Sequence, residues 1–117
     1  MNRKILLTGG GFASHIADLV ISRAGSNFIF EFLFLKKPMI LIPLSANSSR
    51  GYQIDNAKFF ERQGYAEVVL EEDLSSDRLL NLIHNVFVKR QEYIKKMNYS
   101  SDLALDKLFS LITNSID

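Results

Sequence analysis

The stretch Asp18-Leu19-Val20-Ile21-Ser22, followed by Arg23-Ala24-Gly25-Ser26-Asn27, decides the fold of this 117-residue chain. Its first half is a short run of Leu, Val and Ile without polar alternation, which is typical of a strand buried on both faces of an α/β sheet. Its second half combines a glycine with residues that favour the start of a helix. Together they predict a strand that ends in a loop and leads directly into a helix.

Three more apolar runs of this kind occur at residues 4–8 (KILLT), 39–43 (MILIP) and 66–70 (AEVVL). Helical patterns lie between and after the runs, at residues 27–35, 52–63, from near Asp77 onward, 90–97 and 102–112. Gly64 can end the second of these helices, and Ser75 or Ser76 can cap the third. Strands that alternate with helices predict an α/β fold with a Rossmann-like parallel sheet of about four strands.

The connector between the first two predicted strands is short. Residues 9–17 supply nine positions, three of them glycine, whereas a crossover between parallel neighbours usually takes a dozen or more residues. We therefore expect that strand 4–8 is not an ordinary parallel neighbour of strand 18–22. It would pair elsewhere, run in the opposite direction, or exchange into a second protomer.

Composition excludes several classes of function. The 14 Lys and Arg residues nearly balance the 13 Asp and Glu residues, so the chain lacks the cation excess with which nucleic-acid binders neutralise phosphates. It has no Cys for a thiolate zinc site, and His15 and His84 are too few for a three-imidazole site. No apolar run reaches the ~18–20 residues that span a bilayer. We expect a cytoplasmic protein without a metal ion or a nucleic-acid partner.

The junction after strand 18–22 is the strongest candidate site. Ligands of open α/β sheets collect at the carboxyl ends of strands, where a helix N-terminus offers free N–H groups. Gly25 would let a phosphate approach the backbone closely, and Ser26 and Asn27 would donate hydrogen bonds. The same residues also suit an ordinary helix start with a favourable cap, and their spacing alone does not decide between the two interpretations.

Two helical segments add to this candidate site. Glu31 is one acid among seven apolar residues, and one turn into its helix it could accept hydrogen bonds from a ribose diol. It could equally face solvent at the edge of a buried helix, since acids are seldom buried unpaired. Gln53 and Asn56 lie three residues apart, on one face near the start of helix 52–63. They could bind sugar hydroxyls, although without other information capping is the favoured interpretation.

The glycine loop at residues 8–15 (TGGGFASH) fits a dinucleotide-binding fingerprint poorly. Ser14 stands where the third glycine is expected, and no acid follows the next strand, which ends in Ser22-Arg23. An NAD-dependent dehydrogenase is therefore disfavoured.

Several separated motifs together resemble the carboxyl-terminal, donor-binding half of the MurG family. They are ADLVISRAGSN, the helix with Glu31, KKPMILIPL, the Gln53-x-x-Asn56-Ala57 helix start and GYAEVVLEEDL. MurG enzymes are N-acetylglucosaminyltransferases of peptidoglycan synthesis with a two-domain GT-B fold, so the resemblance implies half of a GT-B fold, with residues 17–117 as the donor domain and its helical tail. Residues 1–16 resemble the start of the amino-terminal acceptor domain instead, which implies a large internal gap.

The resemblance also implies roles for the candidate residues. Carried over by position, residues 25–27 would donate hydrogen bonds to the diphosphate of UDP, with Arg23 as their neighbour. Glu31 would bind the ribose hydroxyls, Gln53 would contact hydroxyls of the N-acetylglucosamine, and Asn56 would be a further substrate-binding residue.

The resemblance also implies a role for one residue of the amino-terminal segment 1–16. His15 matches the family's active-site histidine, which would act as general base or orient the acceptor. Phe12 and Ser14 depart from the small or hydroxyl residues usual in that loop, and Tyr52 replaces a polar residue common before the glutamine.

The family further implies the substrates and partners. UDP-N-acetylglucosamine would be the donor substrate and a lipid-linked molecule the acceptor, with no cofactor and no metal, in the cytoplasm or at the inner face of the cell membrane. Turnover would need a second copy or a separate partner that carries an acceptor domain. The alternative is a non-catalytic remnant that still binds a nucleotide sugar.

The phenylalanine-rich helix bears on assembly. Phe28, Phe30, Phe32 and Phe34 alternate, so on a helix they spread over more than one face. Burial of one Phe contributes roughly 1.5–3 kcal/mol, and a domain that lacks several strands has fewer elements to cover it. We expect a homodimer, with exchanged amino-terminal strands as one form of it, and peripheral membrane contact through this patch as the alternative.

Overall fold

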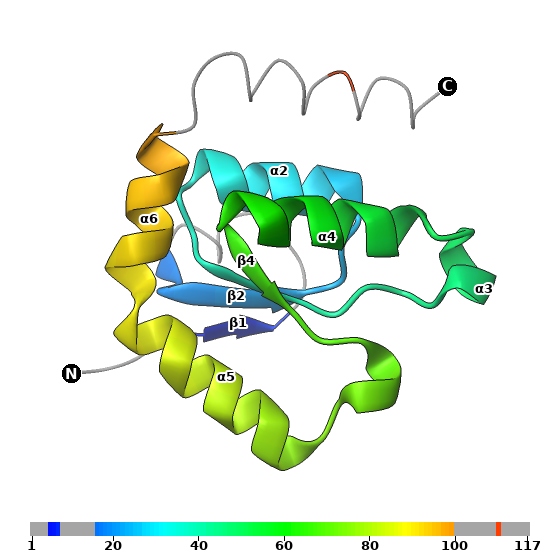
Figure 1. Cartoon of the computed structure of the whole chain (residues 1–117). Helices are drawn as coiled ribbons and strands as arrows, with labels where there is room; N and C mark the ends of the chain where they lie inside the picture. The colour runs from blue at the N-terminus through cyan, green and yellow to red at the C-terminus, as the bar shows by residue number, and fades with distance from the viewer. Residues whose placement is uncertain (1–4, 8–15, 100–109, 111–117) are drawn as a thin grey trace.

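The computed structural model describes residues 5–7, 16–99 and 110. Within these ranges, four strands form one sheet in the order β1-β2-β3-β4, and each neighbouring pair is parallel. The strands are β1 (Ile5–Leu7), β2 (Leu19–Ser22), β3 (Met39–Leu41) and β4 (Ala66–Val68). The predicted α/β fold with a four-stranded parallel sheet is confirmed (Figure 1).

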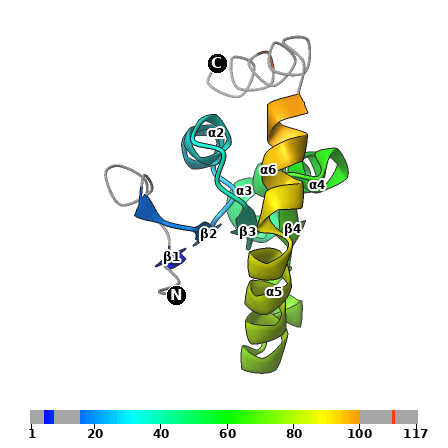
Figure 2. The same ribbon diagram turned by 90° about the vertical axis from the view of Figure 1, so that its left-hand side faces the viewer.

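Helices cover the two faces of the sheet. Strand β2 leads to β3 through α2 (Ser26–Phe34), and β3 leads to β4 through α3 (Ala46–Ser49) and α4 (Tyr52–Gln63). Helices α2 and α4 lie side by side on one face (Figure 1). After β4, the short turn η1 (Glu71–Asp73) leads to α5 (Ser76–Val88) and α6 (Arg90–Tyr99). Helix α5 packs on the opposite face (Figure 2).

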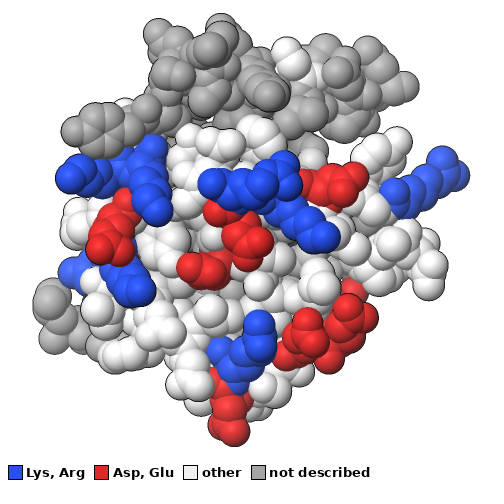
Figure 3. All heavy atoms as spheres, viewed as in Figure 1, with Lys and Arg blue, Asp and Glu red and all other residues white. Residues whose placement is uncertain are grey.

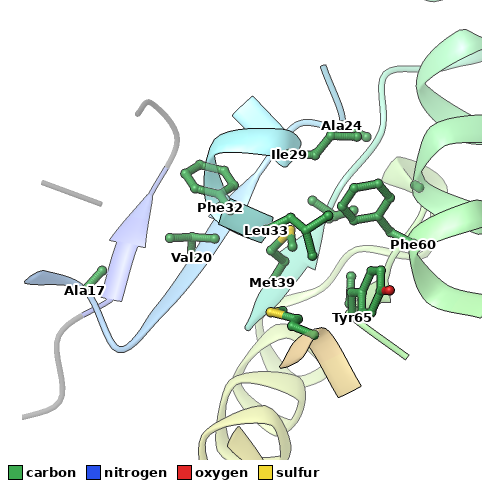
Figure 4. Close-up of a cluster of buried hydrophobic side chains, with 13 residues drawn as sticks. Ala17, Val20, Ala24, Ile29, Phe32, Leu33, Met39, Phe60 and Tyr65 are labelled. Carbon is green, nitrogen blue, oxygen red and sulfur yellow. The ribbon is translucent and has the colours of Figure 1, made fainter. Parts of the chain in front are cut away.

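Side chains of the central strands are buried on both faces, as the apolar runs predict. Val20 of β2 packs in the cluster under α2 and α4, which Figure 4 shows together with Phe32 and Phe60. Its neighbours Leu19 and Ile21 point to the other face and pack in the cluster under α5. Successive strand residues face opposite ways, so a strand without polar alternation needs a covered sheet on each side.

Several local signals in the sequence are confirmed. Helix α4 has the predicted bounds, and Gly64 follows it with a left-handed φ of 83°. The Ser75 hydroxyl caps α5 by accepting a hydrogen bond from Arg78 N at 3.2 Å. Strands β3 and β4 each end two residues earlier than predicted, and α2 begins and ends one residue earlier.

The prediction that the first strand avoids the second is wrong. Strand β1 is a parallel neighbour of β2, with Ile5 opposite Leu19 and Leu7 opposite Ile21. Because β1 ends at Leu7 and β2 begins at Leu19, the connector runs over residues 8–18, which gives eleven positions instead of nine. That length approaches the dozen residues that a parallel crossover usually takes.

Some predictions fall outside the described residues. These are the glycine loop at residues 8–15 with His15, and most of the last predicted helix at 102–112. The predicted division between residues 1–16 and 17–117 stays a prediction.

The surface of the molecule is mixed in charge. On the face shown in Figure 3, the described Lys and Arg side chains are interspersed with Asp and Glu side chains, in keeping with the net charge of +1. None of the described helices combines the length and the apolar character that crossing a bilayer requires.

Candidate functional site

Helix α2 begins at the carboxyl end of β2, and none of the described side chains caps its N-terminus. The N-cap residue is Gly25, and the first turn contains no acidic residue. The first helical hydrogen bond runs from Ile29 N to Gly25 O at 3.1 Å. The N–H groups of residues 26–28 precede this bond and therefore lack a partner within the helix. They lie at the positively polarised end of the helix, which attracts anions.

Nothing in the described part of the chain requires a glycine at position 25. Its φ of −71° and ψ of 141° are extended values that any residue adopts. A Cβ atom there would meet only Gln53 Nε2 and Phe28 Cδ2, both at 3.9 Å, which is ordinary van der Waals distance. Glycine thus leaves space in front of the helix. We call residues 24–28 the amide mouth.

The Gln53 side chain joins the amide mouth to the loop after β3. Its Oε1 accepts hydrogen bonds from Ala24 N at 3.2 Å and from Leu44 N at 3.0 Å. Since both partners are donors, the orientation of the amide is fixed. Its Nε2 lies beside Gly25.

The Asn56 side chain also contacts the amide mouth. Its Nδ2 donates to Ala24 O at 3.2 Å and to Ser26 Oγ at 3.4 Å. Gln53 and Asn56 therefore share a helical face, as predicted, but the favoured interpretation of capping is wrong. The N-cap of their own helix is Gly51, and the hydrogen bonds described above for both side chains run outside that helix, to the strand-end loops and to Ser26 of α2. The face they share is turned to α2 and to the loops after β2 and β3, which supply the partners.

Arg23 and Glu71 tie three strand ends together. Arg23 Nη1 donates to Ile42 O at 3.3 Å and lies 3.3 Å from Glu71 Oε2. Glu71 Oε1 accepts a hydrogen bond from Ser45 N at 3.1 Å. The two side chains are 44% and 43% exposed, so the ion pair contributes at most about 1 kcal/mol. Sequence reasoning missed Glu71, although its place just after the fourth apolar run put a carboxylate at the carboxyl end of a strand.

Two hollows meet at Glu71, on the edge of the sheet where the strands end. One, of about 390 Å³, has walls of Leu7, Ile21, Ile42 and Leu79 with Arg23 and Glu71 beside them. The other, of about 250 Å³, lies between Pro43, Ile54, Leu70 and the acids Glu71 and Glu72. Residues 25–27 line neither hollow, so the amide mouth lies outside them.

The remaining candidates lie on α2 or outside the described residues. Gly25 and Ser26 are half-buried and Asn27 is exposed. Glu31 is half-buried and lies five residues after Ser26, about 7–8 Å along the helix axis. His84, expected to be structural or to face solvent, is exposed on α5. The structure thus groups Arg23, residues 25–27, Gln53 and Asn56 at one end of the sheet, while His15 lies outside the described residues.

Known proteins resemble this chain over most of its length. The sequence profile of the glycosyltransferase family 28 C-terminal domain matches residues 13–111. A relative from Clostridium novyi, a UDP-N-acetylglucosamine--N-acetylmuramyl-(pentapeptide) pyrophosphoryl-undecaprenol N-acetylglucosamine transferase, is 57% identical over 97 residues, which is 82% of this chain and 27% of that protein. The protein of the same name from Geobacillus kaustophilus is 50% identical over 97 residues, covering 83% of this chain and 27% of its own length. The chain therefore spans about a quarter of the length of these curated relatives.

The fold has a solved counterpart. The glycotransferase of kitacinnamycin superposes with a TM-score of 0.64 at 20% identity, over 85% of this chain and 23% of that one. The described residues have the fold of half of a GT-B glycosyltransferase.

Proposed function

The chain belongs to the glycosyltransferase family 28 C-terminal domain family, and from that premise we propose that it binds the sugar donor of a MurG-like transferase, UDP-N-acetylglucosamine. The relatives' names contain this donor. The amide mouth carries the proposal, because it is a helix N-terminus at a strand end that none of the described side chains caps, and its glycine is not required by the packing of the described residues.

Each candidate residue has a role in this proposal. The N–H groups of residues 26–28 would donate to oxygens of the diphosphate and of the sugar next to it. Among the described residues, Arg23 makes exposed contacts with Ile42 and Glu71, and it would add a positive charge to the diphosphate. Glu31, on the same helix, would accept hydrogen bonds from the ribose hydroxyls. Gln53 would donate from Nε2, since its Oε1 is already occupied.

These groups supply one half of the chemistry of transfer. When the sugar leaves UDP, negative charge develops on the diphosphate, and donors fixed in advance around it stabilise that charge. The attacking acceptor hydroxyl also needs a general base, and His15 is the candidate for that role. In this proposal a partner or a second copy supplies the acceptor site, at the membrane face where a lipid-linked acceptor lies.

Calorimetric titration with UDP-N-acetylglucosamine tests the proposal, with Gly25→Ala as the variant. The wild type is expected to bind, and the variant at least tenfold more weakly, because its methyl group occupies the space in front of the amide mouth. Alanine is a poorer N-cap than glycine, which lowers stability, but it also makes the unfolded chain less flexible, which raises stability. The free energy of unfolding should therefore change by less than about 1 kcal/mol.

Asn81→Ala is the matched control. Asn81 is exposed in the middle of α5, and alanine there favours the helix without touching the amide mouth. Its affinity should equal that of the wild type. A wild-type chain without affinity for UDP-N-acetylglucosamine or UDP would contradict the proposal.

A non-catalytic nucleotide-sugar-binding remnant is the second candidate. The observation that favours it is that the described groups at the amide mouth are hydrogen-bond donors, which are sufficient to hold a diphosphate without transferring the sugar. Transfer of labelled N-acetylglucosamine to a lipid-linked acceptor, with and without an added acceptor domain, separates the two. Donor binding without transfer under both conditions would favour the remnant.

A further inference from the structure

We propose that strand β1 pairs, antiparallel, with β1 of a second copy of the chain, so that the two four-stranded sheets join into one. The inference goes beyond the proposed function, because the pairing involves neither the amide mouth nor its ligand. It is carried by the open edge of the sheet at β1, by the direction of the backbone groups of β1 and by the symmetry of its three residues.

The two edges of the sheet are covered differently. At the β4 edge, helix α6 packs on the sheet, where Tyr93 Oη donates to Glu67 Oε1 at 2.7 Å and Met97 is fully buried. At the β1 edge, β2 is the only described strand that pairs, and Figure 2 shows β1 at the end of the row of strands, away from α4 and α6. Ile5 and Leu7 are 38% and 63% exposed. Among the described residues β1 is therefore the open edge, and an open edge strand offers its outer N–H and C=O groups to another strand.

The backbone of β2 shows which of its residues face β1. Val20 N donates to the residue before β3, and Ser22 O accepts from the residue after β3. Val20 and Ser22 therefore turn their backbone groups to β3. Because backbone groups alternate in direction along a strand, Leu19 and Ile21 turn theirs to β1.

The backbone groups of β1 that remain for a further strand belong to Ile5 and Leu7. In a parallel pair, a residue that faces the neighbouring strand bonds to the residues on either side of the one opposite it. Leu19 and Ile21 are opposite Ile5 and Leu7. The N–H and C=O groups of Leu6 consequently face β2, and those of Ile5 and Leu7 face away from the sheet.

This edge is complementary to itself. When Leu6 lies opposite Leu6 of the second copy, Ile5 lies opposite Leu7 of that copy, and Leu7 lies opposite its Ile5. Both of these pairs then bring together residues whose backbone groups face outward, so each pair exchanges two hydrogen bonds. A two-fold axis at Leu6 makes the contact the same for both copies. Ile5 and Leu7 also share one face of β1, so that apolar side chains meet apolar side chains in each pair.

Apolar surfaces on both faces of the sheet continue this contact. On the α5 side, Leu7 lines the hollow of about 390 Å³, and Ile5 of the second copy would extend its wall, since opposite residues of neighbouring strands point to the same face. On the other side, α2 lies above β2 (Figure 2) and carries the exposed rings of Phe28 and Phe34. A stable dimer buries about 1,200–2,000 Å², which a ladder of three residues needs such surfaces to reach.

Disulfide formation between single-cysteine variants tests the pairing. The chain has no native cysteine, so Ile5→Cys and Leu7→Cys each carry one thiol. In the proposed pairing, the Cα atoms of position 5 and of position 7 in the second copy are about 5.5 Å apart, within the roughly 4.4–6.8 Å that a disulfide spans. Each position lies about 8 Å from its own equivalent, which is too far.

Mild oxidation of an equimolar mixture should therefore form the mixed disulfide at least about tenfold faster than either variant forms one with itself. Isotope labelling of one variant identifies the mixed product by mass. Val88→Cys is the matched control, because Val88 is 61% exposed on α5, close to the 63% of Leu7. Mixed with Ile5→Cys, it should react only at the slow rate of the self-linked products.

Sedimentation velocity of two lysine variants is the second test. Leu7→Lys would bury an unpaired charge against Ile5 of the second copy, so it should weaken the dimer at least about tenfold. Val88→Lys makes the same kind of change at an equally exposed apolar side chain and should leave the dissociation constant within about twofold of the wild type. Circular dichroism checks that both variants fold, and the disulfide test decides if Leu7→Lys does not.

The outcomes distinguish this contact from other surfaces. A mixed disulfide that forms no faster than the self-linked ones, or a dimer that tolerates L7K as well as V88K, would overturn the pairing and assign a wild-type dimer to another surface. A wild-type monomer at every concentration would overturn it too. None of these results depends on donor binding, so they leave the proposed function to its own titration.

Discussion

At the residue scale, two glycines at the ends of α4 offer a matched comparison. Gly51 and Gly64 have φ values of 84° and 83°, a left-handed conformation that costs other residues about 1 kcal/mol or more. A Cβ at position 64 would clash with the Lys96 side chain, whereas a Cβ at position 51 would have none of the described residues' atoms within 4 Å.

We expect Gly51→Ala to lower the free energy of unfolding by about 1 kcal/mol and Gly64→Ala to lower it by a few tenths more, because the flexible end of Lys96 must move aside. Urea unfolding of the two variants measures the difference. If the two variants lose the same free energy of unfolding, the contact with Lys96 has no cost, and only the left-handed backbone conformation favours glycine at position 64.

Gln53 shows what can be predicted for a single residue. Its spacing from Asn56 placed both side chains on one helical face, and the resemblance named both as candidate contacts. Their partners could not be predicted, because Ala24 is 29 residues away from Gln53 and Leu44 is nine residues away. Only the packed sheet brings the two loops within reach of one amide group.

At the element scale, a partly buried hydrogen bond joins α6 to β4. Tyr93 Oη donates to Glu67 Oε1 at 2.7 Å. Burial, followed by this hydrogen bond, raises the pKa of Tyr93 well above its ordinary value of 10.0. The folded protein therefore keeps a proton that the unfolded chain loses near pH 10, so folding is favoured less and less as the pH rises beyond that point.

We expect the free energy of unfolding to fall above pH 10 by up to about 1.4 kcal/mol per pH unit from this one group. Tyr93→Phe should remove that part of the slope. Urea titrations between pH 8 and pH 11 measure it. A slope of unchanged size in the variant would assign the alkaline loss to other groups.

Strand β1 marks the limit of prediction at this scale. The apolar runs located all four strands, because uninterrupted Leu, Ile and Val suit burial on both faces. The pairing of β1 was predicted wrongly because it was argued from the connector length, and strand ends drawn one residue too long on each side shortened that connector from eleven residues to nine. An error of that size is ordinary for element boundaries.

At the scale of the whole molecule, the phenylalanine-rich helix is only partly enclosed. Phe32 is buried, and Phe30 packs edge-on against Phe60 with ring centroids 6.0 Å apart. Phe28 and Phe34 remain 42% and 83% exposed. Because burial of exposed aromatic side chains against a partner is favourable, these two rings support our proposal of a homodimer.

Sedimentation velocity over a wide range of concentrations tests the dimer. We expect a dimer for the wild type and a shift toward monomer for Phe34→Ser, because the variant removes the most exposed of the four rings. Leu80→Ser, at a side chain that is 64% exposed on α5, should leave the dimer unchanged. A wild-type monomer at every concentration would contradict the proposal.

The space that the described residues leave in front of Gly25 predicts different outcomes for an alanine variant in two kinds of selection experiment. A library selected for solubility or heat resistance would retain an alanine at this position, since the described residues leave room for its methyl group. A library selected on nucleotide capture would reject the same alanine. A position at which alanine is tolerated in the first selection and rejected in the second contributes to ligand binding and not to folding stability.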